Sequence, residues 1–305
     1  MGKTAFLFAG QGAQAPGMGA DICRGSAAAA EIFKAADQVM PGISSLCFEG
    51  DEAVLMLTKN TQPALYVTEM AIAAAAKEAG LKADCAAGFS LGELSALAFA
   101  GAFDFETGLE LVMKRGAFMQ EASEAHPAKM AAVVKLSNEK VEEICTQFEH
   151  VYPVNFNCPG QVSVSGLADE MDLLPAKVKE AGGRAIPLKV SGAFHSPFMA
   201  EASEKFNAEL QKAQIGTPEI RVYANFTGSP YGSNVRGLLS NQMANPVKWE
   251  TTIRNMIGDG VDTFIELGPG KTLSGFVKKI DGSVKILGIS NMEELEKAVK
   301  EAADD

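Results

Sequence analysis

Residues 86–93 read Ala-Ala-Gly-Phe-Ser-Leu-Gly-Glu, and they join the end of an apolar segment to the start of a helical pattern. This is a GxSxG pattern, in which Gly88 and Gly92 allow the backbone to turn sharply at Ser90. Such a corner exposes the serine hydroxyl as a candidate nucleophile, and the free N–H groups of the following helix start favour negative charge on a nearby carbonyl oxygen. A Gly/Ser-rich turn with no catalytic role has the same pattern, so the surrounding chain has to decide between the two.

A second glycine-containing loop follows an apolar segment near the N-terminus. Residues 4–9 are predicted to form a buried strand, and residues 10–15 read GQGAQA, which matches the GxGxxA pattern of dinucleotide-binding loops. A proline and a glycine directly afterwards interrupt the helix that this pattern requires, and no acidic residue ends a second strand at the right distance, which disfavours a dinucleotide site. Hydrolase-like sites take one oxyanion donor from such a loop and one from the residue after the nucleophile, which indicates the backbone N–H groups of Gln11 and Leu91.

Strand and helix patterns alternate along the chain, which predicts an α/β protein. Between residues 129 and 189 the predicted order is β-α-β-β-α-β, with Pro159-Gly160 at the centre of a type II turn. We therefore expect residues 125–190 to form a small ferredoxin-like α+β domain inserted into a larger one. Residues 1–124 and 191–305 would then form a discontinuous, α/β-hydrolase-like catalytic domain with a mostly parallel sheet, and the ligand would bind between the two domains.

His195 is the candidate base among three histidines. It lies in a Gly/Ser loop directly before a helix predicted to start at Pro197, whereas His126 and His150 lie at element boundaries with no partner in view. A loop histidine is also common as a simple polar residue, but a serine elbow followed later by histidine is the order found in α/β hydrolases.

No acidic residue is well placed to complete a triad with Ser90 and His195. Between them along the chain, Asp169 and Asp172 belong to the predicted small domain, while the later residues 245–249, NPVKW, offer backbone carbonyls. A carbonyl can fix the imidazole tautomer by accepting its N–H, although it stabilises the imidazolium less than a carboxylate does. We therefore expect a Ser-His dyad.

Arg115 lies inside a helix predicted from Asp104 to about Glu124. On sequence alone it is a solvated surface charge, or the partner of Glu110 or Glu121 in a salt bridge. Only a ligand with a carboxylate would give a reason to place it elsewhere.

Composition excludes several classes of function. A formal net charge of −11 argues against broad nucleic-acid binding. Five widely spaced cysteines without a CxxC pair indicate neither a disulfide framework nor a zinc site, and we expect reduced thiols in a cytoplasmic protein and no metal. The most alanine-rich run, residues 71–76, falls far short of the roughly 20 residues that span a bilayer, so no membrane role is expected.

Taken together, the motifs resemble those of the malonyl-CoA:acyl carrier protein transacylase family. The resemblance extends from Phe6 to about Leu287 and rests on eight stretches in the same order: FAGQG at 8–12, TQPAL at 61–65, GFSLGE at 88–93, KRG at 114–116, NFNCPGQ at 155–161, GAFHS at 192–196, NPV at 245–247 and ELGPG at 266–270.

The resemblance implies an acyltransferase of fatty-acid biosynthesis that uses coenzyme A thioesters and a transiently bound acyl carrier protein, without a further cofactor. Its implied site consists of Ser90 as nucleophile, His195 as base, the N–H groups of Gln11 and Leu91 as oxyanion donors, Arg115 as partner of the malonyl carboxylate, and Gln62, Asn157 and Phe194 as substrate-binding residues. A planar guanidinium suits that carboxylate because it binds both oxygens at once. The ring of Phe194 would crowd an α-methyl branch and disfavour methylmalonyl.

Alternatives and departures remain. A serine esterase or thioesterase, an acyltransferase of a polyketide pathway and a non-catalytic acyl-CoA-binding protein are the other functions considered, and a monomer is favoured. Most family members have histidine where this chain has Phe89, and Lys248 replaces a common glutamine. Candidates for a basic face that binds the acidic carrier are Lys189, Lys271, Lys278 and Lys279, although solvated surface lysines are common.

Overall fold

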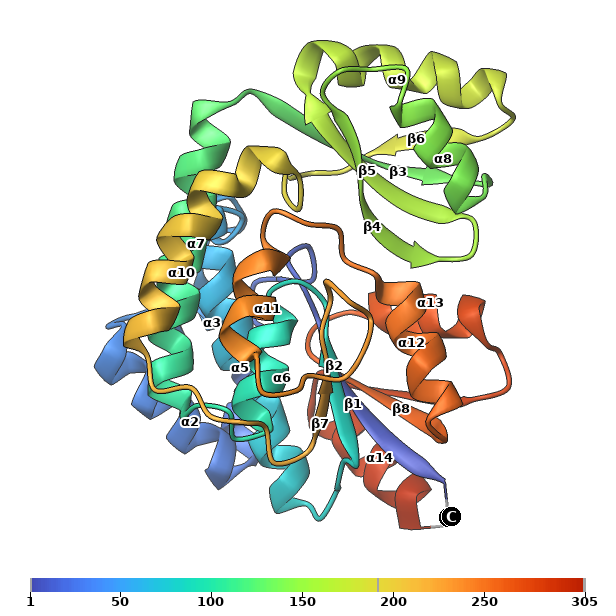
Figure 1. Ribbon diagram of the computed structural model, residues 1–305. Coiled ribbons are helices and arrows are strands. Elements are labelled where there is room, and N and C mark those ends of the chain that lie inside the picture. Colours follow the sequence, from blue (N-terminus) through green and yellow to red (C-terminus); the bar gives the residue numbers. More distant parts are fainter. Residues whose placement is uncertain (1, 191, 304–305) are drawn as a thin grey trace.

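The computed structural model describes residues 2–190 and 192–303, and its larger sheet is entirely parallel (Figure 1). The strand order is β7-β2-β1-β8-β9. The strands are β1 (Lys3–Phe8), β2 (Cys85–Gly88), β7 (Arg221–Tyr223), β8 (Val261–Leu267) and β9 (Lys285–Ile289). Phe8 pairs with Gly88 on one side and Leu267 on the other, so the loops after three neighbouring strands leave the same edge of the sheet.

The alternation of side chains along β1 explains why both faces of this sheet are covered. Phe6 and Phe8 point into one apolar cluster, and Ala5 and Leu7 point into another, all without exposed surface. The first cluster is covered by α1 (Ala20–Gly25), α2 (Ala27–Val39), α3 (Ile43–Glu49), α4 (Glu52–Leu55), α5 (Thr58–Glu78), α6 (Gly92–Phe99), α7 (Phe105–Ala125), α10 (Ala200–Lys212), α11 (Val235–Gln242) and α14 (Met292–Ala303). The second is covered by α12 (Trp249–Gly258) and α13 (Thr272–Ile280).

Helix α5 begins at Thr58, so Gln62 and Pro63 lie within it. A proline usually marks a helix start because it lacks the N–H needed further inside. Here Pro63 lies in the second turn, where it leaves one backbone carbonyl of the first turn without its helical donor. The consequence for the site is that Gln62 projects from a helix and not from a loop.

A second sheet of four antiparallel strands lies above the first in Figure 1. Its order is β4-β5-β3-β6, built from β3 (Ala128–Val134), β4 (Val151–Cys158), β5 (Gln161–Leu167) and β6 (Arg184–Pro187), with α8 (Asn138–Cys145) and α9 (Ala168–Glu180) packed on its separate apolar core. The predicted β-α-β-β-α-β element order is confirmed, and so is the hairpin turn at Pro159-Gly160, where Gly160 has φ 73°. The short helix η1 (Pro197–Met199) leads back into α10.

A parallel bridge links the loop before α12 to β4, the edge strand of the second sheet. The N–H of Phe156 donates to the carbonyl of Val247 over 2.9 Å, and the N–H of Val247 donates to that of Val154 over 2.9 Å. The loop before α12 therefore behaves as an extra strand of the second sheet.

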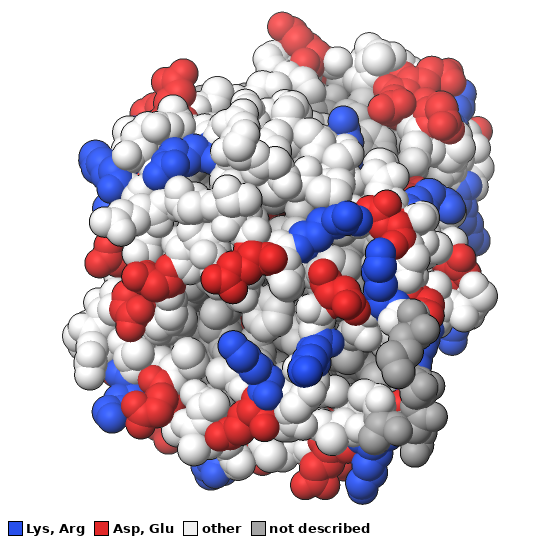
Figure 2. Space-filling view, turned by 60° about the horizontal axis from the view of Figure 1, so that its bottom comes forward, with Lys and Arg blue, Asp and Glu red and all other residues white. Residues whose placement is uncertain are grey.

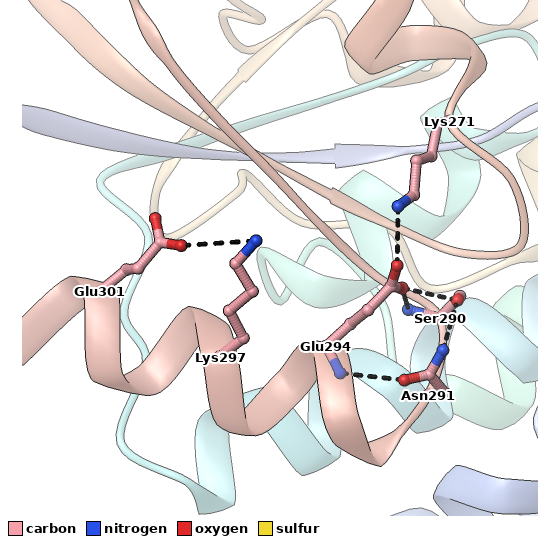
Figure 3. A network of polar contacts seen from close by, with 6 residues as sticks. All are labelled: Lys271, Ser290, Asn291, Glu294, Lys297 and Glu301. Carbon is pink, nitrogen blue, oxygen red and sulfur yellow. Dashed lines mark hydrogen bonds and ion pairs between the residues drawn. The ribbon is translucent and has the colours of Figure 1, made fainter.

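Polar contacts fasten the last helix to the loop after β8 (Figure 3). Lys271 Nζ lies 2.9 Å from Glu294 Oε1, while Glu294 Oε2 accepts the backbone N–H of Ser290 over 3.0 Å and its hydroxyl over 2.7 Å. Asn291 Oδ1 accepts the N–H of Glu294 over 2.9 Å at the helix start. Lys271, one of the lysines considered for carrier docking, is thus engaged within the chain.

Candidate active site

The elbow between β2 and α6 holds Ser90 in a left-handed conformation with φ 55°. Only glycine fits on either side of it. A Cβ at Gly88 would lie 1.8 Å from the carbonyl oxygen of Gly92, and one at Gly92 would lie 2.2 Å from that of Phe8. Non-glycine residues in this backbone region cost on the order of 1–3 kcal/mol and concentrate at functional sites.

Gly88→Ala should therefore lower the free energy of unfolding by about 3 kcal/mol or more, because the added methyl group meets backbone that cannot move aside. Denaturant unfolding measures this. Gly275→Ala is the matched control: nothing lies within 4 Å of its Cβ position and it is inside a helix, so it should stabilise by up to about 1 kcal/mol. Equal effects of the two changes would contradict this account of the elbow.

The side chain of Asn225, in the turn after the neighbouring strand β7, binds the backbone of the elbow. Its Oδ1 accepts the N–H of Ser90 over 2.7 Å, and its Nδ2 donates to the carbonyl of Gly88 over 2.6 Å. Asn225 has no exposed surface. Because the N–H of Ser90 is used in this way, the next free N–H along the chain belongs to Leu91.

Ser90 and His195, predicted from separate loops, lie together. Ser90 Oγ is 2.7 Å from His195 Nε2, and His195 Nδ1 is 2.9 Å from the carbonyl oxygen of Gln242. A carbonyl only accepts, so Nδ1 carries the proton and Nε2 is free to accept from the serine hydroxyl. His195 also has a left-handed backbone, with φ 60°.

The carbonyl that holds His195 Nδ1 at this distance comes from Gln242, three residues before the 245–249 stretch expected from the sequence. Gln242 is the last residue of α11, and carbonyls at a helix end lack an intrahelical donor, which leaves this one available. The hydrogen-bond partner of His195 Nδ1 is therefore a backbone carbonyl and not a carboxylate.

The imidazole of His195 is held neutral. Burial lowers its pKa to about 4 and the positive charge of Arg115 acts in the same direction, while hydrogen bonds to the carbonyls of Gln242 and Asn245 oppose the shift. At neutral pH the ring is therefore ready to accept a proton.

The pH dependence of Ser90 reactivity should reflect this shift. Below its folded-state pKa the imidazole is protonated and cannot accept, so a lowered pKa keeps the base active to lower pH. The labelling rate with a neutral, serine-directed sulfonyl fluoride should stay level from neutral pH down to about pH 5 and fall as pH approaches about 4. A fall centred near pH 6.5, the ordinary histidine value, would contradict the burial of this ring.

Two backbone N–H groups next to Ser90 have no acceptor among the described residues. They belong to Gln11 and Leu91. The loop of Gln11 approaches the elbow closely, because a Cβ at Gly10 would lie 2.6 Å from the carbonyl oxygen of Phe89. The side chain of Gln11 is held away by a 3.1 Å hydrogen bond from its Nε2 to Thr58 Oγ1.

Arg115 is fully buried, not on the surface, and pairs with neither Glu110 nor Glu121. Its Nη1 donates to Gln62 Oε1 over 2.7 Å, and its Nη2 donates to Gln242 Oε1 over 2.7 Å and to Ser90 Oγ over 3.2 Å.

The guanidinium stays charged although it has no direct counter-ion. Burial lowers the pKa of Arg115 to about 10, and the charge of Glu93 opposes that shift. Within residues 2–190 and 192–303 no carboxylate lies within 4.0 Å of it, and its Nε is buried without a partner. A buried cation with open donors beside a nucleophile is suited to an anionic substrate group.

Three residues of the site were missed by sequence reasoning: Glu93, Asn225 and Gln242. Glu93 Oε1 accepts the N–H of Asn225 over 3.1 Å and the hydroxyl of Tyr231, and its Oε2 accepts Gln242 Nε2 over 2.7 Å. Gln242 Nε2 also donates to the carbonyl of Ser90 over 2.6 Å. Burial raises the pKa of Glu93 to about 7. The only sequence signal was Glu93 itself, which closes the elbow motif.

The other residues expected at the site occupy different positions. Gln62 contacts Arg115, and Phe194 is buried directly before His195. Asn157 lies on β4, where its Nδ2 donates to Ser163 Oγ over 3.1 Å, and it makes no hydrogen bond to Ser90, His195 or Arg115.

Phe89 turns away from the serine toward α12 and α13. Its ring meets Trp249 edge-on at 5.4 Å and Phe276 at 6.3 Å, measured between ring centroids. The residue at which this chain departs from the family pattern is therefore part of an aromatic cluster beside the elbow.

The far end of the strands is separate from this site. A cavity of about 740 Å³ lies there, lined by Thr4, Lys82, Asp262 and others, and it shares no residue with the site. Figure 2 looks toward this end of the molecule, where acidic and basic side chains alternate without a large area of one sign.

The described part of the chain contains neither a metal-binding cluster nor a membrane-spanning helix. No cluster of three or more His, Cys, Asp or Glu side chains is arranged to hold a metal ion. No helix there has the length and apolar character needed to cross a bilayer.

Comparison with known proteins identifies close relatives. The family model of the acyl transferase domain matches residues 5–293. The malonyl CoA-acyl carrier protein transacylase of Bacillus subtilis (strain 168) is 41% identical, covering 98% of this chain and 97% of its own length. The solved transacylase of that name from Clostridium perfringens superposes with a TM-score of 0.96 at 41% identity, over 99% of this chain and 98% of its own.

A third relative has been solved with its partner. It is the complex PlMCAT:AntF, a type II PKS acyl-carrier protein with its malonyl-transacylase. The match has a TM-score of 0.95 and 34% identity, over 98% of this chain and 99% of that one.

Proposed function

The chain belongs to the malonyl CoA-acyl carrier protein transacylase family of acyl transferases, and from this premise we propose how its own residues transfer a malonyl group. The enzyme moves malonyl from malonyl-CoA to the phosphopantetheine thiol of acyl carrier protein. The proposed intermediate is a malonyl ester of Ser90, formed and resolved in two successive thioester exchanges.

In the first exchange, His195 Nε2 takes the hydroxyl proton while Ser90 Oγ attacks the thioester carbonyl. The oxyanion that forms accepts the N–H groups of Gln11 and Leu91. When the tetrahedral intermediate collapses, the C–S bond breaks and coenzyme A leaves as a thiol with the proton from His195. The second exchange reverses these steps with the carrier thiol as nucleophile.

One observation supports malonyl as the acyl group that the site accepts: Arg115 Nη2 lies 3.2 Å from Ser90 Oγ. A three-carbon diacid esterified to Ser90 has its free carboxylate close to the ester carbon, so its partner must be this near. The side-chain oxygens of Gln62 and Gln242 each accept a hydrogen bond from the guanidinium and so fix its plane. An acyl group without a carboxylate would leave a buried cation unpaired.

The experiment that tests the function is malonyl-CoA turnover with and without holo acyl carrier protein. Transfer requires carrier-dependent loss of malonyl-CoA with malonyl recovered on the carrier. Free malonate released at equal rates in both mixtures would support a serine esterase or thioesterase, and binding without turnover would support an acyl-CoA-binding protein.

We place the reaction in fatty-acid biosynthesis, with a polyketide pathway as the alternative. The polyketide alternative is supported by one observation: the relative that was solved as a complex is bound to a type II PKS acyl-carrier protein. Comparing holo carriers of both pathways as acceptors at equal concentration distinguishes them.

We further infer that residues 125–190 form an inserted ferredoxin-like domain and that 1–124 with 191–305 form an α/β-hydrolase-like catalytic domain. The strand order β4-β5-β3-β6 and the separate core under α8 and α9 support the first part. The parallel sheet with the Ser90 elbow at its carboxyl edge supports the second.

The remaining proposals concern conditions and assembly. The thioester already activates the acyl group, so we propose that no cofactor takes part. All five cysteines are free thiols, four of them buried, which supports a reducing compartment such as the cytoplasm. A monomer would suffice, because every residue of the proposed site comes from one chain.

A further inference from the structure

We propose that Glu93 is a positioning residue that fixes the side-chain amide of Gln242 and thereby aims Arg115 at the substrate carboxylate. Glu93 has no exposed surface, makes no hydrogen bond to Ser90 Oγ or His195, and takes no part in the proposed transfer steps. The proposal rests on the proposed function, because it assumes that Arg115 binds malonyl.

The hydrogen bonds around Glu93 are satisfied only by a group that accepts on both oxygens. The N–H of Asn225 and the hydroxyl of Tyr231 point at Oε1, and Nε2 of Gln242 points at Oε2. A carboxylate accepts all three, whereas an amide in the same place must present a donor to one of these donors.

This arrangement determines which way the amide of Gln242 faces. Its Nε2 lies between two acceptors, Glu93 Oε2 at 2.7 Å and the carbonyl of Ser90 at 2.6 Å. Its Oε1 must therefore face Arg115 Nη2, which it does at 2.7 Å. Turned over, the amide would place an oxygen against the Ser90 carbonyl and an NH₂ against the guanidinium.

The same arrangement separates Glu93 from Arg115 by one amide. Glu93 is the charged group that acts on the pKa of Arg115 and raises it against burial. A carboxylate in direct contact would stabilise the cation more but would occupy the donors that malonyl needs. With Gln242 between them, the cation has a counter-charge and keeps its donors open.

The experiment compares acylation of Ser90 by malonyl-CoA and acetyl-CoA in wild type and Glu93→Gln. The oxygen of the new amide is expected to face the two donors Asn225 and Tyr231, which turns its NH₂ toward the single donor of Gln242. This forces a mismatch at Gln242 or, if the Gln242 amide turns over, at Arg115, so the malonyl-to-acetyl ratio of kcat/KM should fall about tenfold or more. The backbone carbonyl of Gln242 belongs to a helix and stays in place. Labelling of Ser90 by a neutral sulfonyl fluoride, which does not use Arg115, should therefore fall much less than the malonyl-to-acetyl ratio does.

Glu69→Gln is the matched control. Glu69 is equally buried and lies on α5, where its carboxyl accepts from Ser95 Oγ over 2.6 Å and from the backbone N–H of Ala9, and it makes no hydrogen bond to Gln242 or Arg115. Its malonyl-to-acetyl ratio should equal that of the wild type. A reduced ratio in this control as well would assign the effect to any buried Glu→Gln change and overturn the proposal.

Gln242→Met gives a second route that does not depend on Glu93→Gln being folded. It removes the linking amide while keeping its approximate volume, so it should lower the ratio by itself. The double variant with Glu93→Gln should then be no worse than Gln242→Met alone, because the two act through one contact. Additive effects, or equal losses of malonyl, acetyl and sulfonyl fluoride reactivity, would overturn the proposal.

Measuring Arg115→Ala in the same experiment distinguishes a failure of this proposal from a failure of the proposed function. If wild type shows no malonyl preference, or keeps it in Arg115→Ala, the assignment of Arg115 fails and the role of Glu93 fails with it. If Arg115→Ala loses the preference but Glu93→Gln and Gln242→Met retain it, only the role of Glu93 is overturned.

Discussion

Ser90→Ala should lower malonyl transfer by a factor of about 10⁴ to 10⁶, the size of effect seen when a serine nucleophile is removed. The variant retains the proposed oxyanion donors and Arg115, so malonyl-CoA should still bind, but no ester can form. Mass spectrometry of the protein after brief exposure to malonyl-CoA measures the ester directly. The wild type should gain one malonyl group and Ser90→Ala none.

Ser95→Ala is the control for this change. It removes a buried serine one turn further along α6 that donates to Glu69 and not to the site. Its acylation should be retained, with at most a modest loss of stability. Malonyl exchange that persisted in Ser90→Ala would remove the dyad from the mechanism.

The second large effect is expected for Arg115→Ala, which should lower kcat/KM for malonyl-CoA by about 10² to 10⁴. Two hydrogen bonds to a charged group, each worth roughly 1.5–3 kcal/mol, would be lost to the substrate carboxylate. Transfer of acetyl should rise relative to malonyl. In the wild type, an acetyl group leaves the buried Arg115 cation without a partner, and the variant has no such cation. Competition between the two thioesters in one mixture measures the ratio.

Arg115→Lys and Arg254→Ala complete this comparison. A lysine keeps the charge but presents no planar pair of donors, so most of the malonyl preference should still be lost. Arg254 is half exposed and pairs with Glu250 on α12, so its removal should leave the ratio unchanged. A preference for malonyl that survived in Arg115→Ala would show that the carboxylate binds elsewhere.

The sequence alone predicts those site residues that lie at sharp turns of the backbone. Gly88 and Gly92 mark the elbow because a side chain collides with backbone there, and the loop around His195 is marked by its glycine and the helix start that follows. Each lies at the end of a regular element, where turns leave a sequence signature.

Arg115 could not be placed by its own pattern. It lies in a long helix with charges on either side, and such an arginine usually faces solvent. What turns it inward is the pair of glutamine oxygens from α5 and α11, which are 53 and 127 residues away along the chain. Only the family resemblance gave a reason to expect it.

For a related reason, the sequence could not predict that Asn225, Gln242 and Glu93 belong to the candidate site. Their contacts with one another and with the backbone of the elbow join residues 132 to 152 positions apart, and amide and acidic residues carry no periodic signal that distinguishes an inward from an outward position. The strand before Asn225 has only three residues and lies at the edge of the sheet, so it also lacks an apolar run long enough to predict.

The left-handed backbone of Ser90 has a consequence for thermal tolerance. The fold is less stable with the reactive serine in place than it would be with glycine, the residue that this conformation suits best. Ser90→Gly should be inactive yet melt at a higher temperature than the wild type. The proposed nucleophile thus weakens the fold that carries it, and selection for heat resistance alone would remove it.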